Sequence, residues 1–81
     1  MDVSVSFYSY FKDMTGCART TETLPDKASI GDLLHRLAIR FPKLEAIQKS
    51  SLVAVGVDYQ DRGFELKHGD EVSLFPPVQG G

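Results

Sequence analysis

The sequence contains a single cysteine, Cys17, and no long apolar run. One cysteine excludes an internal disulfide and a Cys-x-x-Cys metal or redox motif, which fits a reducing compartment. No stretch approaches the roughly eighteen apolar residues of a membrane helix, and no basic N-terminal segment precedes an apolar run. Nine basic residues against eleven acidic ones give no electrostatic reason to bind nucleic acid or an anionic membrane. These absences predict a cytoplasmic protein that binds neither nucleic acid nor a membrane.

The side chains that usually perform catalysis are isolated from one another in the sequence. His35 and His68 are not spaced as a pair of metal ligands, and Cys17 has no histidine beside it to activate it as a nucleophile. Asp70 and Glu71 are adjacent, and adjacent residues of a strand point to opposite faces. No glycine-rich phosphate loop is present. The sequence therefore predicts no metal site, no bound cofactor and no active site within the chain itself.

The first 24 residues predict a β-hairpin. Apolar and polar side chains alternate over residues 3–11, which is typical of a strand with one buried face. Residues 12–16 end in a glycine and predict a turn, and the threonine-rich residues 18–24 predict a second strand that pairs back on the first. The polarity of this second strand favours a place at the edge of the sheet.

The middle of the chain predicts one amphipathic helix. Ser29 is a good N-cap, and Asp32 lies three residues later, where its carboxylate can reach back to the cap. Pro42 predicts the end of the helix, and residues 44–47 predict a further helical turn. The apolar side chains fall at helical spacing, on Ile30, Leu33, Leu34, Leu37, Ala38 and Phe41.

The rest of the chain predicts three more strands, over residues 52–57, 64–66 and 71–75, separated by turns over 58–63 and 67–70. A helix that crosses over between the first and last strands suits a parallel pairing of those two strands. The fold class is therefore α+β, a roll in which one main helix packs on one face of a mixed sheet of about five strands. A chain of this length makes one domain.

The last six residues predict an extended tail that leaves the folded domain. Two prolines lack the N–H that a strand ladder needs, so the strand over residues 71–75 must end before them and the tail points outward as a stiff stalk. Two terminal glycines can thread a channel too narrow for other residues, although they also occur in frayed chain ends. We predict a folded domain over 1–75 and a functional tail over 76–81, comprising Pro76, Pro77, Val78, Gln79, Gly80 and Gly81.

The alternation of the first and last strands also predicts an aromatic surface. If the helix covers the face that carries Val3, Val5, Phe7, Val72 and Leu74, then Tyr8, Tyr10 and Phe75 emerge together on the uncovered face. Exposed aromatic side chains often anchor partner proteins. A docking surface beside the tail is one interpretation of this patch, and shielding of an open sheet face is the other.

Two motifs near the C-terminus resemble those of a known family. They are Gly69-Asp70-Glu71-Val72 and the run from Phe75 through Pro76-Pro77 to Gly80-Gly81, which together with residues 7–16 and the helix placement span nearly the whole chain. With them the chain resembles the ubiquitin-like sulfur carriers that form the small subunit of molybdopterin synthase. Sulfur carriers of the thiamine pathway also end in two glycines but generally lack the Phe-Pro-Pro run. One departure is Gly56, where the family pattern usually has asparagine.

The resemblance implies a β-grasp fold and a sulfur-carrier role. An ATP-dependent activating enzyme would adenylate the carboxylate of Gly81 and convert it to a thiocarboxylate. The carrier would then insert its tail into the large subunit, in a heterotetrameric synthase, and donate sulfur to cyclic pyranopterin monophosphate to form the molybdopterin dithiolene. The catalytic groups are expected on the large subunit. By position, the partner surface would include Tyr8, Lys12, Tyr59 and Phe75.

Other functions remain open at this point. The chain could donate sulfur in another pathway, such as the synthesis of thiamine or cysteine or the thiolation of transfer RNA. It could be a ubiquitin-like modifier that becomes attached to lysines. A third hypothesis, of a different class, is an interaction module whose tail is inert.

Overall fold

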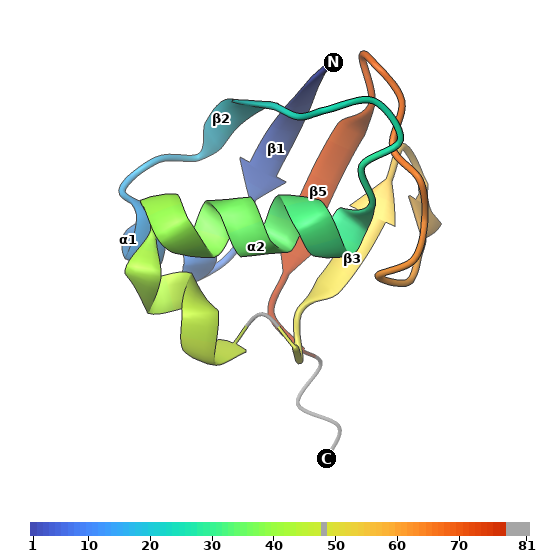
Figure 1. Cartoon of the computed structure of the whole chain (residues 1–81). Helices are drawn as coiled ribbons and strands as arrows, with labels where there is room; N and C mark the ends of the chain where they lie inside the picture. Colours follow the sequence, from blue (N-terminus) through green and yellow to red (C-terminus); the bar gives the residue numbers. More distant parts are fainter. Residues whose placement is uncertain (48, 78–81) are drawn as a thin grey trace.

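The chain folds into a mixed β-sheet crossed on one face by a helix (Figure 1). This computed structural model describes residues 1–47 and 49–77. The elements are β1 (Asp2–Phe7), α1 (Phe11–Thr15), β2 (Arg19–Thr23), α2 (Ile30–Arg40), the 3-10 helix η1 (Pro42–Ile47), β3 (Leu52–Val55), β4 (Asp58–Tyr59) and β5 (Glu71–Phe75). The five strands lie in the order β2-β1-β5-β3-β4. The predicted α+β roll is confirmed, including β2 as an edge strand.

The last strand of the chain occupies the middle of the sheet. β5 runs parallel to β1, with Val5 opposite Val72 and Phe7 opposite Leu74. On its other side β5 runs antiparallel to β3, where Leu52 lies opposite Phe75. The parallel pairing of the first and last strands is therefore as predicted, and it gives the C-terminal end of β5 a strand on each side.

The main helix begins at the predicted cap. The Ser29 hydroxyl accepts a hydrogen bond from the Asp32 N–H, and the Asp32 carboxylate accepts one from the Ser29 N–H, at 3.2 and 2.9 Å. The next two helical N–H groups donate to the carbonyls of Phe64 and Arg62. All the orphan donors of the first turn therefore have partners within the chain. The helix ends at Arg40, just before Pro42.

The capping box makes stability depend on pH. The Ser29 N–H, and then the Ser29 hydroxyl, hold the pKa of the exposed Asp32 carboxyl below its ordinary value of 3.8. Because the pKa is lowered in the folded state, the ionised Asp32 carboxyl stabilises the fold fully above pH 3.8, and this stabilisation is lost as the pH falls through the folded value.

We expect Asp32→Asn to lose stability at neutral pH and to show a shallower further loss below about pH 4. Urea unfolding at several pH values measures this, with Asp26→Asn as the loop control; parallel acid curves for Asp32→Asn and the native chain would contradict it.

The core lies between α2 and the sheet. Val3, Val5 and Phe7 of β1 are buried on this face, and the ring of Phe7 packs edge-on against Phe41 at 5.7 Å between centroids. The helix contributes the buried members of the predicted apolar stripe, which are Ile30, Leu33, Leu34 and Leu37. Among the described residues, no helix is long and apolar enough to cross a membrane.

The first strand is shorter than predicted. β1 ends at Phe7, and the Tyr8 N–H makes the last ladder bond, to the Leu74 carbonyl. Ser9 then has φ of +56°, which reverses the chain, and α1 begins at Phe11 in place of the predicted turn. Phe11 is fully buried, as its place in the alternation suggested, but a helix buries it and not a strand. The predicted strand over residues 3–11 is thus wrong beyond Phe7.

Three predictions in the second half of the chain are also wrong. The strand predicted over 52–57 ends at Val55, because Gly56 has φ of +62° and turns the chain tightly into β4. Residues 58–63 were expected to be a turn, yet Asp58 and Tyr59 form β4 and pair with β3. The strand predicted over 64–66 is reduced to one bridge between Glu65 and Ser29, because this segment crosses the start of α2 and not the sheet.

Candidate functional site

The tail leaves the domain from the end of the middle strand. Phe75 makes the last strand pair of β5, opposite Leu52, and Pro76 and Pro77 follow outside any strand. β5 ends at the same edge of the sheet where α1 and η1 lie (Figure 1). The prolines explain why the strand ends at the predicted residue, since neither can donate to a ladder. The remaining predicted tail residues, Val78, Gln79, Gly80 and Gly81, lie outside the described residues.

Three rings gather beside the base of the tail, and we call Tyr8, Tyr59 and Phe75 the aromatic cluster. Tyr8 stacks on Phe75 with ring centroids 4.6 Å apart and planes 14° from parallel. Tyr59 approaches the same ring edge-on at 6.1 Å. Tyr8 is 44% exposed and Tyr59 is 67% exposed. The cluster therefore presents aromatic surface to solvent next to the point where the tail begins.

Three strands position the cluster. Tyr8 directly follows β1, and Phe75 ends β5, the neighbouring parallel strand. Tyr59 lies on β4 opposite Ala54 of β3. Ala54 in turn pairs with Ser73 of β5, so these side chains share the sheet face that α2 does not cover. The contact between Tyr8 and Phe75 agrees with the prediction, made from the alternation of the first and last strands, that both side chains lie on the uncovered face.

Two other predicted partner residues lie outside this cluster. Tyr10 caps α1, and its ring packs edge-on against Phe11 at 5.4 Å. Its expected place on a strand face with Tyr8 is wrong, because the chain has already turned at Ser9. Lys12 is exposed on α1, one helical position after Phe11. Their role in partner binding stays a prediction.

The turn before Tyr59 accounts for the departure at Gly56. A φ of +62° is left-handed backbone, which glycine adopts freely and asparagine adopts more readily than most other residues. Glycine at this position is therefore compatible with the tight turn that places Tyr59 opposite Ala54. Tyr59 could not be placed from alternation, because a two-residue strand has no periodicity. The available signal was the glycine of the two-residue turn Gly56-Val57, which directly follows the apolar residues 52–55.

The polar groups of the described chain form no catalytic constellation. His68 accepts a hydrogen bond through Nδ1 from the Asp2 N–H, at 3.0 Å, in the turn before β5. Cys17 is half-buried, and its Sγ lies 3.8 Å from the Thr15 hydroxyl. Over residues 1–47 and 49–77, no three His, Cys, Asp or Glu side chains are grouped to bind a metal ion. Within the described residues, the site therefore consists of an exposed aromatic surface beside the start of the tail, and a role of that surface in docking stays a prediction.

These features define a class of protein: a ubiquitin-like β-grasp domain whose central last strand leads into a tail ending in two glycines. The chain belongs to the ThiS family, whose model matches residues 5–81. It is 32% identical over 84 residues to the molybdopterin synthase sulfur carrier subunit of Chlamydomonas reinhardtii, and the match covers all of both chains.

Two further proteins show the range of this likeness. Small archaeal modifier protein 3 of Haloferax volcanii is 28% identical over 92 residues, again across both whole chains. A solved structure from Pyrococcus furiosus, a putative molybdopterin converting factor subunit 1, superposes with a TM-score of 0.88 at 28% identity and covers 96% of this chain and 99% of that one. Carriers and modifiers therefore share this fold.

Proposed function

We propose that the chain is the sulfur carrier subunit of a molybdopterin synthase. The single observation that carries the proposal is the tail: Phe75 ends the middle strand inside the aromatic cluster, and the sequence then runs Pro76-Pro77 to Gly80-Gly81. Relatives named as molybdopterin synthase sulfur carrier subunits match this chain from end to end. The proposal extends to cyclic pyranopterin monophosphate as the sulfur acceptor.

The chemistry resides in the terminal carboxylate. A carboxylate oxygen of Gly81 attacks the α-phosphorus of ATP, pyrophosphate leaves, and the acyl adenylate is a good electrophile. The outer sulfur of a persulfide supplied by the activating system then attacks the acyl carbon and displaces AMP. A thiol of the same system cleaves the resulting acyl disulfide by exchange, which releases the thiocarboxylate and leaves a disulfide on that system.

The thiocarboxylate sulfur attacks a carbon of the acceptor and an oxygen substituent leaves that carbon. Water then cleaves the resulting thioester, which restores the carboxylate and leaves the sulfur on the acceptor as a thiolate. Two such donations supply the two sulfurs of a dithiolene.

The domain's own contribution is delivery. A glycine-ended tail holds its sulfur within a partner's pocket at high effective concentration and needs no free sulfide. Because the aromatic cluster adjoins the base of the tail, contact with it fixes where the tail enters the partner. We assign both the activating enzyme and the large synthase subunit as partners of this surface, with the catalytic groups on those partners. ATP is then bound by the activating enzyme and not by the carrier.

Intact mass tests the proposal directly. The full chain is incubated with ATP, a sulfur donor and a purified molybdopterin-pathway activating enzyme, beside a variant that lacks Gly81. We expect a mass gain equal to the replacement of one oxygen by sulfur in the full chain only. The charged chain should then convert cyclic pyranopterin monophosphate when the large subunit is added. No gain, while a known carrier is charged in the same mixture, would overturn the proposal.

The archaeal relative supports a second candidate, a protein modifier. Adenylation of Gly81 is common to both functions, and they diverge at the nucleophile, which is sulfur for a carrier and a lysine amine for a modifier. A modifier would form stable high-mass conjugates that resist thiols. A carrier for another pathway would gain sulfur but fail to convert the pterin with the large subunit.

The aromatic cluster gives a prediction about affinity. Phe75→Ala removes the ring that both tyrosines contact, and Tyr59→Ala removes the most exposed ring. We expect each variant to bind the large subunit at least about tenfold more weakly, since buried aromatic anchors dominate interfaces. Titration calorimetry measures this, and circular dichroism confirms that each variant is folded.

Ile39→Ala is the matched control for these variants. Ile39 is an exposed apolar residue on α2, 68% accessible and on the other side of the sheet from the cluster. Its replacement should leave the affinity unchanged. Unaltered affinity of both cluster variants for the large subunit and for the activating enzyme would remove the cluster as the docking surface.

A further inference from the structure

A strained backbone position lies beside the aromatic cluster. Ser9 has φ of +56°, in the left-handed region that is unfavourable for residues with a Cβ. Apart from glycines, the described residues contain one other positive φ, of +69° at Lys27. Ser9 separates two exposed tyrosines, Tyr8 and Tyr10, just after β1 ends. Such strain persists only where the surrounding structure holds it, and it is concentrated at functional sites.

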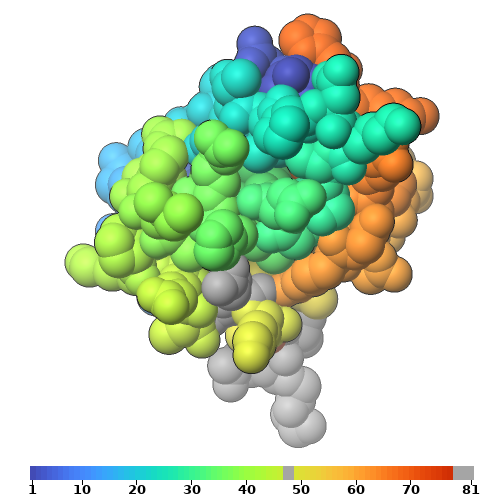
Figure 2. Space-filling view, viewed as in Figure 1, coloured from blue at the N-terminus to red at the C-terminus, as the bar shows by residue number. Residues whose placement is uncertain are grey.

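The contacts on either side of Ser9 fix its conformation. Before it, the Tyr8 N–H donates to the Leu74 carbonyl at 3.2 Å and keeps Tyr8 in line with the sheet. After it, Phe11 is fully buried, and the Phe11 N–H donates back to the Tyr8 carbonyl at 3.2 Å. Figure 2 shows the face of the sheet that α2 (green) covers, and Phe11 belongs to the core beneath this helix. The Tyr8 ring lies on the opposite face, so the chain must change direction between these two residues.

Relief of the strain displaces Tyr8 before it displaces Phe11. Burial of a phenylalanine side chain stabilises a fold by more than the net contribution of one backbone hydrogen bond. If residue 9 leaves the left-handed region, Phe11 therefore keeps its place in the core. The Tyr8 N–H then loses the Leu74 carbonyl, and the Tyr8 ring loses the stacked contact with Phe75, in which the centroids are 4.6 Å apart.

We propose that Ser9 is a positioning residue for the aromatic cluster. Its left-handed backbone directs Tyr8 onto Phe75 and so forms the stacked pair at the base of the tail before any partner arrives. The consequence for binding rests on the proposed function, in which the activating enzyme and the large subunit dock on this cluster. A partner that meets a stacked pair does not have to order the Tyr8 ring, so the conformation of Ser9 increases the affinity.

Ser9→Val tests the proposal on the full chain. Valine is β-branched and adopts a positive φ less readily than serine, and because position 9 is exposed, the change acts on the backbone and not on core packing. We expect the KM for sulfur loading by the activating enzyme to rise at least about fivefold, because the fraction of chains with a stacked pair sets the apparent affinity. The kcat should stay unchanged, since the reacting tail is not altered.

NMR of the free chain reports the stacked pair without any partner. Each ring of a pair stacked at 4.6 Å shifts the proton resonances of the other, so the ring protons of Tyr8 and Phe75 should move toward unstacked values in Ser9→Val. Ser9→Gly allows the same φ without strain and should keep the native ring shifts and the native KM. The two variants together separate the backbone conformation from the loss of the serine hydroxyl.

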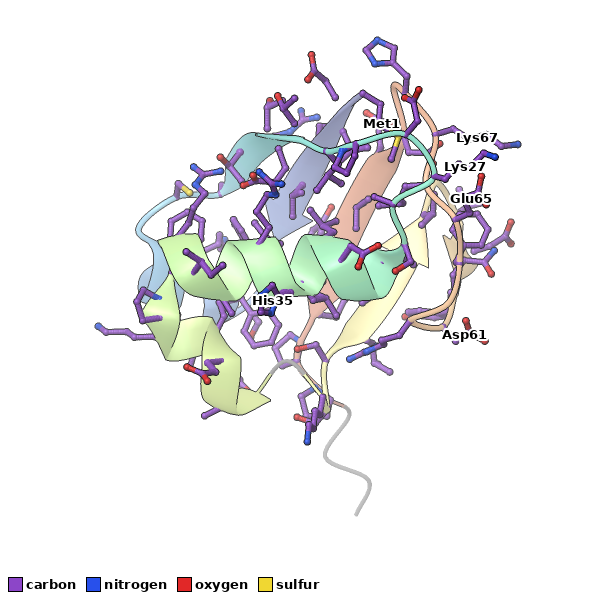
Figure 3. The ribbon with its side chains drawn as sticks, in the orientation of Figure 1. Met1, Lys27, His35, Asp61, Glu65 and Lys67 are labelled. Carbon is purple, nitrogen blue, oxygen red and sulfur yellow. The ribbon has the colours of Figure 1, made fainter. Side chains whose placement is uncertain are left out.

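Lys27→Val is the matched control. It places valine at the other strained position, in the loop before the start of α2, whereas α1 lies near the end of that helix (Figure 1 and Figure 3). It should lower stability to a similar extent and leave both the KM and the ring shifts unchanged.

Three results would each overturn the role of Ser9: native ring shifts in Ser9→Val, a native KM in Ser9→Val, or an equal rise in KM for both valine variants. A native chain that is not loaded at all would instead overturn the carrier function. The ring shifts would then still decide whether Ser9 positions Tyr8, because they are measured on the free chain.

Discussion

Gly81→Ala is expected to lower the rate of adenylation and sulfur loading by about 100-fold or more, because displacement of a reacting group by about 1 Å costs rates of that order. The added methyl group is placed directly beside the carboxylate that must reach ATP in a narrow channel. The free energy of unfolding should not change, since the residue follows two prolines that already lie outside the sheet. Intact mass over time gives the loading rate, and urea unfolding gives the stability.

Gly69→Ala is the matched control for that substitution. Gly69 has φ of +88° in the turn before β5, and a Cβ added there meets no atom within 4 Å. Alanine at this position costs about 1–2 kcal/mol of backbone strain and should leave loading unchanged. The two glycine variants therefore show opposite effects on loading and stability. Normal loading of Gly81→Ala would mean that the activating enzyme does not enclose the tail tightly, and would weaken the argument from the two glycines.

The elements that could be predicted from the sequence are those with a local signal. The helix followed from the apolar spacing after Ser29, and its start from Ser29 and Asp32, which satisfy each other within four residues. The end of β5 followed from Pro76, because a missing N–H acts on its own strand whatever the tertiary structure. Since β5 pairs with β1, the meeting of Tyr8 and Phe75 could also be derived.

The elements that could not be predicted depend on backbone angles or on distant partners. Tyr8, Tyr10 and Phe11 continue the alternation of β1, and nothing in the residue type of Ser9 indicates its positive φ. The residues of α1 were therefore predicted to be the end of a strand followed by a turn. Tyr59 reaches the cluster through β4, whose two residues are too few to show a period.

The contact between Glu22 and Arg40 likewise could not be predicted from the sequence. Glu22 lies among threonines on an edge strand, where a charged side chain usually faces solvent. In the structure it lies on the helix side of the sheet, opposite Val3, and its side chain is only 7% exposed. Arg40, eighteen residues later, is the group that makes this burial possible.

Arg40→Met should therefore lower the free energy of unfolding by about 2–3 kcal/mol. This cost is smaller than the usual cost of breaking a buried ion pair, because the Arg40 side chain is 42% exposed. The substitution leaves the Glu22 carboxylate buried without its cation and removes the bonds to Thr20 and Thr21. For a domain of this size the melting temperature should fall by roughly 8–24 °C. Urea and thermal unfolding measure both quantities.

Arg36→Met provides the control, one helical turn earlier on the same helix. Arg36 is exposed without an ion pair in the described chain, so its loss should change stability by no more than about 0.5 kcal/mol.

Glu22→Met combined with Arg40→Met removes both charges and should recover much of the lost stability, because apolar replacement of a whole buried pair is often neutral. Equal stabilities of Arg40→Met and Arg36→Met would show that the pair contributes nothing. A coupling energy near zero in the double-mutant cycle would place the cost of Arg40→Met in its bonds to β2 and not in the charge of Glu22.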